Sequence, residues 1–286
     1  MQVALQCGSL WLAGMGFRDW VNVADMLGFR AVELWLDRGN FWPLTSAKTE
    51  RRKALEELKA HGISVPSICP LPLEEGGWSE FRFEFNIATP DDNRRGKALE
   101  FYRRAVDVAV DFEAETVLAL PGKMEEPNRI KSEHSYRRHL DNLVESLKNL
   151  SKYAGDRGIT LGVENAVVCN YIDLPSELKY VVESVGADNV RVYLDVANAN
   201  VFMDPLIYVE ELASLLCGQI HITDNKGDKP LHLPLGMGSI DYGNIIARLR
   251  ELGWDGHLLP EIFYNVDPIG GLRICKKKLE NVISRL

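Results

Sequence analysis

Eight short runs rich in valine, isoleucine and leucine alternate along the chain with longer amphipathic segments. This alternation is typical of βα units around a parallel sheet, because each buried strand is covered by a helix before the next begins. The predicted strands lie at residues 3–7, 31–36, 64–68, 116–120, 160–164, 190–195, 219–223 and 257–262. Eight units favour a closed (β/α)8 barrel, with residues 1–286 as one domain.

Capping signals support the division into units. Three helices are predicted to begin after a capping side chain, namely Thr89, Asp204 and Asp241. Other helices are predicted to end at glycines that adopt a left-handed conformation: Gly28, Gly62, Gly158 and Gly253. An open, doubly wound sheet is the alternative, but no Gly-x-Gly-x-x-Gly follows the first strand to mark a dinucleotide site.

The net charge of the chain disfavours some classes of binding partner. The 286 residues include 41 acidic and 33 basic side chains, a formal net charge of −8, and the basic residues form no stripe. Nucleic acid and anionic membranes are therefore disfavoured, and a small-molecule partner is expected. No run approaches the ~20 apolar residues of a membrane span, and no basic leader opens the chain, so we expect a cytoplasmic protein. The sequence leaves a homo-oligomer open.

The number and spacing of the cysteines also favour a cytoplasmic protein. The chain has five, an odd number, widely spaced and without a Cys-x-x-Cys pair. Reduced thiols are expected, with no disulfide framework.

Four late strands carry an ionisable residue where they end or just beyond: Glu164, Asp195, His221 and Glu261. In a closed α/β barrel, the carboxyl ends of the strands meet at one mouth, where active sites lie. Three buried carboxylates would be costly there without a cation. The donor set suits one divalent metal, Mn²⁺, Mg²⁺ or Co²⁺, and the histidine also allows Zn²⁺. Helix capping or pairing with lysine and arginine would explain any one of these residues, but explains all four together poorly.

Four motifs follow one another in the second half of the chain. They are Gly-Val-Glu-Asn at 162–165, Leu-Asp-x-x-Asn at 194–198, His-x-x-Asp-Asn-Lys-Gly at 221–227 and Pro-Leu-Gly-x-Gly-x-Ile-Asp-Tyr at 234–242. With these motifs the chain resembles the sugar phosphate isomerase/epimerase family of xylose isomerase-like TIM barrels. The resemblance implies that Glu164, Asp195, His221 and Glu261 take the four metal-ligand places of that family.

Two departures from the family pattern concern the substrate. Many ketose 3-epimerases have Asp-x-x-His where this chain has Asp195 and Asn198, and asparagine there resembles the branch that acts on pentulose 5-phosphates. Asp224 and Lys226 replace a glutamate and an arginine that are typical of epimerases for non-phosphorylated ketoses. Trinuclear zinc endonucleases of the wider fold need several more strand-end histidines, and of the six here only His221 and His232 are suitably placed.

The paired carboxylates indicate the reaction. A metal would hold the oxygens of a ketose and stabilise an enediolate, while Glu164 and Glu261 remove and return a proton. Return to the opposite face of the same carbon gives 3-epimerisation of a ketose or ketose phosphate, the expected activity. Aldose–ketose isomerisation, an inosose-type dehydration and a non-catalytic sugar- or metal-binding barrel stay open as alternatives.

Further residues are candidates for substrate binding. Glu33 and Asp37 flank Trp35 near the end of the second strand, followed by Arg38, and would contact sugar hydroxyls or form a salt-bridged rim. His232, Asn198 and Asp224 would contact the sugar, and Lys226 and Lys229 a phosphate, unless these loop side chains are simply solvated. Three tryptophans are candidates to wall the pocket: Trp11, Trp35 and Trp78.

Overall fold

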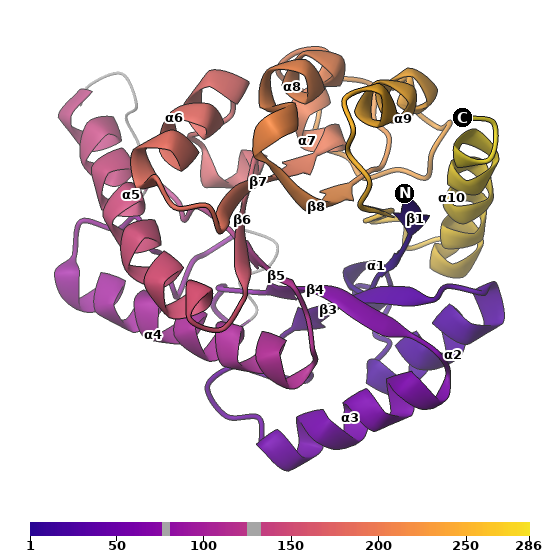
Figure 1. Cartoon of the computed structure of the whole chain (residues 1–286), viewed down its shortest axis with the longest axis horizontal. Helices are drawn as coiled ribbons and strands as arrows, with labels where there is room; N and C mark the ends of the chain where they lie inside the picture. The colour runs from indigo at the N-terminus through magenta and orange to yellow at the C-terminus, as the bar shows by residue number, and fades with distance from the viewer. Residues whose placement is uncertain (76–80, 125–132) are drawn as a thin grey trace.

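Parallel strands form the centre of the structure and helices surround them (Figure 1). The computed structural model describes residues 1–75, 81–124 and 133–286. The strands are β1 (Gln2–Val3), β2 (Leu5–Gln6), β3 (Ala31–Leu36), β4 (Ser64–Pro70), β5 (Thr116–Ala119), β6 (Thr160–Glu164), β7 (Val190–Asp195), β8 (Leu216–His221) and β9 (His257–Leu259). Their order in the sheet is β1-β9-β8-β7-β6-β5-β4-β3-β2, and every pair is parallel.

The first strand closes the barrel. β1 and β2 are separated only by Ala4; β1 pairs with β9, whereas β2 pairs with β3. The two ends of the sheet therefore meet in one chain segment, and eight strand positions result. The predicted (β/α)8 barrel is confirmed, and the open doubly wound alternative is excluded by this closure.

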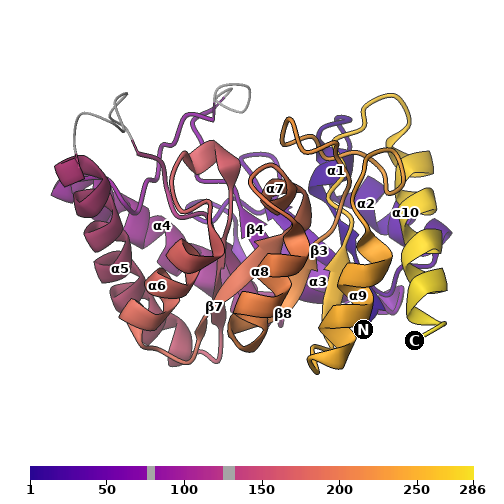
Figure 2. The same ribbon diagram turned by 90° about the horizontal axis from the view of Figure 1, so that it is seen from above.

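The helices follow the strands as predicted. They are α1 (Gly8–Trp11), α2 (Phe17–Leu27), α3 (Lys48–Ala60), α4 (Asp92–Asp111), α5 (Glu133–Gly155), α6 (Pro175–Val185), α7 (Val196–Asn200), α8 (Pro205–Leu212), α9 (Tyr242–Glu251) and α10 (Pro268–Ile283). In Figure 2, which turns the molecule by 90° from Figure 1, α1 and α7 lie in the upper half below the loops, and both termini lie in the lower half. No helix in the described ranges is long and apolar enough to cross a membrane.

The capping predictions hold with one exception. Asp204 and Asp241 accept backbone amides at the starts of α8 and α9, and the four predicted glycines all have positive φ. Thr89 was the wrong cap for α4, which begins two residues later than predicted. Asp91 caps this helix instead, because its Oδ1 accepts the amides of Asn93 and Arg94 at 2.9 and 3.0 Å.

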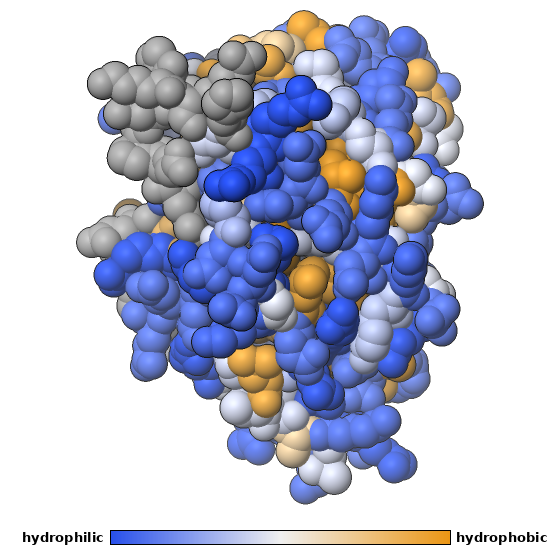
Figure 3. Space-filling model, turned by 90° about the vertical axis from the view of Figure 1, so that its left-hand side faces the viewer, coloured by the Kyte–Doolittle hydropathy of each residue, from blue (hydrophilic) through white to orange (hydrophobic). Residues whose placement is uncertain are grey.

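The outer surface of the barrel is mostly hydrophilic on the side that lies to the left in Figure 1, and the hydrophobic areas on this side are small and separate (Figure 3). Many large apolar side chains are buried, among them Trp20, Trp35, Tyr102 and Tyr193, whereas others such as Met26 and Val266 are exposed.

One strand glycine makes room for a ring inside the barrel. A Cβ added to Gly162 on β6 would lie 2.8 Å from Cδ2 of Tyr193 on the neighbouring strand β7. The missing side chain therefore allows the tyrosine ring to lie directly against the backbone of β6. From this position the Tyr193 hydroxyl donates a hydrogen bond to Glu33 on β3, 2.5 Å away.

We predict that Gly162→Ala lowers the free energy of unfolding by about 1–3 kcal/mol, since the added methyl group overpacks the interior beside Tyr193. Gly218→Ala is the matched control, because this β8 glycine has no heavy atom within 4 Å of its added Cβ among the described residues. That variant should be as stable as the wild type or slightly more stable. Urea unfolding measures both, and equal stability of the two variants would contradict the packing role.

Candidate metal centre

The four strand-end residues meet at the mouth of the barrel. Glu164 ends β6, Asp195 ends β7, His221 ends β8 and Glu261 follows β9. One ligand atom from each lies within 4.8 Å of those of the other three, and all four side chains are buried. The sequence prediction that these residues converge is therefore met by the geometry.

Asp195 has an unsatisfied oxygen inside this cluster. Its Oδ1 accepts the backbone amide of Asn198 at 2.7 Å, but its buried Oδ2 has no hydrogen-bond partner among the described residues. Leaving a buried carboxylate oxygen unpaired is costly, and a cation at the centre of the cluster would remove that cost. Three carboxylates and one imidazole thus fit a divalent metal.

His221 is fixed by a carboxylate behind it. Its Nε2 lies 2.8 Å from Oε1 of Glu33, while its Nδ1 faces Glu164 at 3.2 Å and Glu261 at 3.3 Å. The other oxygen of Glu33 accepts hydrogen bonds from Ser67 and Tyr193 at 2.7 and 2.5 Å. Glu33 therefore orients the imidazole so that Nδ1 is the nitrogen available to a metal.

The crowding of charges shifts the pKa values of the cluster. Burial is the largest cause that raises the pKa of Glu164 and of Asp195 above their ordinary values. Burial opposes protonation of His221, but the carboxylates of Glu261 and Glu33 outweigh it and raise the pKa of His221 well above its usual range. Without a cation, protons therefore compensate part of the negative charge.

A cavity of about 140 Å³, the inner cavity, opens onto the cluster. Its polar floor contains Glu164, Asn198, His232 and Glu261, and its walls are mostly apolar. Trp35 and Phe263 are among these walls, and the ring of Phe263 stacks on His232 with centroids 4.4 Å apart. Three predicted substrate-binding residues, Asn198, His232 and Trp35, thus line the space beside the candidate metal centre.

Other predicted contacts lie elsewhere. Glu33 is fully buried, is not among the described residues lining this cavity, and has both oxygens engaged behind His221. Lys226 and Lys229 are exposed and are not part of the described lining either. Trp78 lies outside the described residues.

The Asp224 carboxylate accepts hydrogen bonds from the backbone of a neighbouring loop. Its Oδ2 accepts the amide of Gly236 at 2.8 Å and its Oδ1 that of Ile240 at 3.1 Å. Gly238 passes so close that an added Cβ would lie 2.2 Å from the Asp224 carboxylate. The structure thus places the predicted sugar contact Asp224 beneath the loop at 233–240, where backbone amides occupy both of its oxygens.

Gln6 is a site residue that the sequence reasoning missed. Its side-chain amide donates to Oε1 of Glu261 at 3.0 Å, and its own oxygen accepts the amide of Ser9 at 3.2 Å. Gln6 ends β2, so its signal was the same as that of the late strands, a polar residue at the end of an apolar run.

The fold and the cluster define a (β/α)8 barrel with a carboxylate–histidine centre at the carboxyl ends of its strands. The family model for the xylose isomerase-like TIM barrel matches residues 21–279, and the chain belongs to this family. L-ribulose-5-phosphate 3-epimerase UlaE of Escherichia coli O8 is 26% identical over 267 residues, which cover 91% of this chain and 84% of the relative. Fructoselysine 3-epimerase of Shigella flexneri is 24% identical over 258 residues, covering 86% and 83%.

Solved structures share the fold over its full extent. A D-tagatose 3-epimerase-like protein superposes with a TM-score of 0.80 at 22% identity, covering 100% of this chain and 99% of the other. The IOLI protein, solved with a zinc atom bound, superposes with a TM-score of 0.78 at 16% identity and the same coverage of each chain. Relatives and structural neighbours of the chain thus include sugar epimerases.

We predict that Asp224→Ala lowers the free energy of unfolding by about 1–3 kcal/mol, because two backbone amides beneath the loop lose their acceptor. Lys226→Ala, two residues away and exposed, should change it by no more than about 0.5 kcal/mol. Hydrogen exchange at Gly236 and Ile240 should accelerate only in the Asp224 variant. Unchanged stability and exchange, with a loss confined to sugar affinity, would instead make Asp224 a substrate contact.

Proposed function

We propose that this protein is a divalent-metal-dependent sugar epimerase that inverts the carbon next to the carbonyl of a ketose, by 3-epimerisation through an enediolate. The observation that carries the proposal is the buried Oδ2 of Asp195, which has no hydrogen-bond partner among the described residues and lies within a cluster of four candidate ligands. The relatives that act on L-ribulose 5-phosphate and fructoselysine are both named 3-epimerases, which supports the same reaction type.

Four side chains would hold the metal: Glu164, Asp195, Glu261 and, through Nδ1, His221. The IOLI protein, with its bound zinc atom, supports a metal in a barrel of this fold. When bound, a divalent cation supplies a Lewis acid that polarises the ketose carbonyl and makes the adjacent C–H bond more acidic. Glu33 contributes by holding the imidazole in place through its 2.8 Å contact with Nε2.

Glu164 and Glu261 carry the proton transfer in this proposal. Both carboxylates line the inner cavity, and they come from the end of β6 and from the residues after β9, which are separated by β7 and β8 in the sheet. One takes the proton from C3 of the ketose, leaving the electron pair in the C2–C3 enediolate. The other gives a proton to the opposite face of C3, which regenerates the ketone with inverted configuration.

A thiol on the wall of the inner cavity does not offer a nucleophile. Cys69 lines the inner cavity, but burial raises the pKa of its thiol well above the ordinary value, so the thiol stays neutral. Asn198 and His232 are placed to bond sugar hydroxyls beside the carboxylates. The proposed phosphate contacts of Lys226 and Lys229 are not required, because the reacting end is the same in free and phosphorylated ketoses.

We predict that Mn²⁺, Co²⁺ or Zn²⁺ binds the metal-free protein at one ion per chain and releases at least one proton. The raised pKa values of His221, Glu164 and Asp195 mean that protons must leave before these groups can act as ligands, so affinity should rise with pH. Calorimetry at one pH in two buffers of different ionisation enthalpy counts the protons.

Two variants test where the metal binds. Asp195→Ala should lose stoichiometric binding, whereas Asp204→Ala, which alters only the cap of α8, should retain it. Full metal content in Asp195→Ala would refute the ligand assignment.

We further predict that metal-loaded wild type exchanges the C3 hydrogen of a ketose with deuterated water. Glu164→Gln and Glu261→Gln keep an oxygen near the metal but remove the proton-transfer group, so each should slow exchange about 10²–10⁴-fold. Glu115→Gln, at the amino end of β5, is the control that should leave the rate unchanged. Wild-type exchange in both variants, measured with full metal content, would contradict the paired-carboxylate mechanism.

A further inference from the structure

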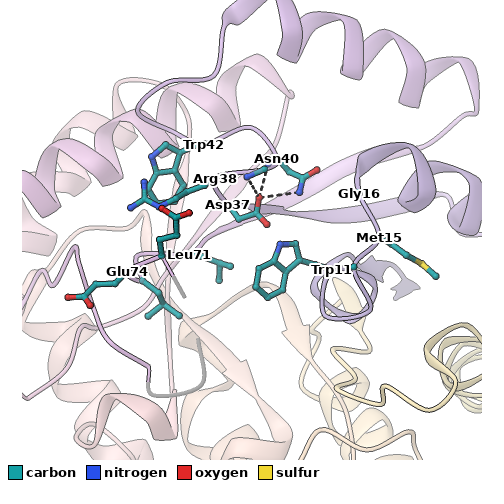
Figure 4. A pocket seen from close by; sticks show the side chains of 13 residues that line it. Trp11, Met15, Gly16, Asp37, Arg38, Asn40, Trp42, Leu71 and Glu74 are labelled. Atoms are coloured by element: carbon teal, nitrogen blue, oxygen red, sulfur yellow. Dashed lines mark hydrogen bonds between the residues drawn. The ribbon is translucent and has the colours of Figure 1, made fainter. Parts of the chain in front are cut away.

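A second and larger cavity lies beside the inner one. This outer cavity has a volume of about 540 Å³. Its described lining comes from three segments: the end of α1 with the turn to α2, the connection between β3 and α3, and the residues that follow β4. Figure 4 shows Trp11, Asp37 and Leu71 around the open space, with Trp42 and Arg38 on one side of it.

The two cavities adjoin. Leu71 and Leu73 line both of them. Trp11 lines the outer cavity and Trp35 the inner one, and their rings are in tilted contact with centroids 5.4 Å apart. A molecule whose reacting end occupies the inner cavity would therefore extend past these side chains into the outer one.

The volumes suggest that such a molecule is larger than one simple sugar. The inner cavity corresponds to about five water molecules at ~30 Å³ each, below the ~300–1,000 Å³ that is usual for a ligand site. The outer cavity falls within that range. The inner space therefore suits the reacting part of a substrate, and the outer space a further group attached to it.

Asp37 gives the outer cavity a carboxylate acceptor. Its Oδ1 accepts the amides of Gly39 and Asn40, both at 2.7 Å, and the Asn40 side chain at 3.1 Å. Its Oδ2 accepts no hydrogen bond from the described residues, although Asp37 is only 8% exposed. In Figure 4 the carboxylate lies between Asn40 and Trp11, at the edge of the cavity. A ligand hydroxyl would satisfy this oxygen.

The charges of the lining disfavour an anionic group. Among the described lining residues, Asp37, Glu74 and Glu75 contribute carboxylates, and Arg38 contributes the single guanidinium. That guanidinium is already paired with Glu84 and lies 4.5 Å from the centroid of the Trp42 ring. A phosphate would therefore meet net negative charge, whereas a neutral polyhydroxylated ring offers donors to the carboxylates and apolar C–H faces to Trp11 and Trp42.

We propose that the outer cavity binds a neutral glycosyl unit, so that the substrate is a ketose that carries a second sugar ring. The attachment leaves the carbonyl and the neighbouring carbon free to reach the candidate metal centre. This inference rests on the proposed epimerase function for the reacting end and adds the recognition of the distal ring by Asp37 and the two tryptophans.

The test compares three ketoses that differ only at O6: fructose, fructose 6-phosphate, and isomaltulose, which carries a glucosyl ring there. Deuterium exchange at C3 is followed with the metal-loaded wild type. We expect kcat/KM for isomaltulose to exceed that for fructose at least ten-fold, with fructose 6-phosphate no better than fructose. A higher value for the phosphate, or equal values for fructose and isomaltulose, would overturn the proposal.

Variants assign the effect to the outer cavity. Asp37→Asn keeps an Oδ1 acceptor for the turn but replaces the free acceptor by an amide, and Trp11→Leu removes an aromatic wall. Each should lower the ratio of kcat/KM for isomaltulose to that for fructose at least five-fold. Asp241→Asn is the matched control, because its Oδ1 also accepts a backbone amide, 3.1 Å away in a remote helix cap. A ratio that stays at the wild-type value in both test variants would overturn the assignment.

A binding measurement separates this proposal from the proposed function. Saturation-transfer NMR with isomaltulose should detect contact at the glucosyl protons in the wild type and weaker contact in Asp37→Asn and Trp11→Leu. If no ketose exchanges but this contact is found, the epimerase proposal fails and the outer site stands. If fructose exchanges and the glucosyl ring shows no contact, the outer site fails and the epimerase proposal stands.

Discussion

The bond between Glu33 and His221 organises the mouth of the barrel. Behind the imidazole, the Glu33 carboxylate is held by Ser67 and Tyr193, and in front of it three further carboxylates converge. A buried imidazole bracketed by carboxylates is stable only when each partner has one orientation, since rotation would leave a charge unpaired in a medium of low dielectric. The packing of Tyr193 against Gly162 therefore matters to the site, although neither residue lines the inner cavity.

The sequence predicted the strands and the barrel better than the roles of individual polar residues. The bounds of β3, β6 and β7 agree with the predicted strands, because buried apolar runs and the glycines before them are local signals. The four strand-end residues were also predictable, because closure of a barrel brings its strand ends together whatever the details of the loops. Thr89 was misassigned as a cap because Asp91, only two residues on, competes for the same role.

The role of a polar side chain could not be predicted where it depends on contacts with residues far away in the sequence. Glu33 and Asp37 look alike in the sequence, as acids on either side of Trp35, but one lies behind His221 and the other borders the outer cavity. β3 is buried on both faces, so the alternation of polar and apolar residues does not reveal which side chains point to the barrel interior. Likewise, the partners of Asp224 are amides 12 and 16 residues further along, in a loop without regular structure.

The hydrogen bond from Gln6, at the end of β2, to Glu261, two residues after β9, joins positions that are 255 residues apart in the chain. During synthesis, the amino-terminal strand β1 leaves the ribosome long before its partner β9 has been made. The pairing that closes the barrel therefore forms only after the last strand has been synthesised. The pairs that close it have high contact order and carry the largest loop-closure entropy. Completion of the site is thereby coupled to completion of the chain, and an incomplete product lacks both the last strand and one wall of the centre.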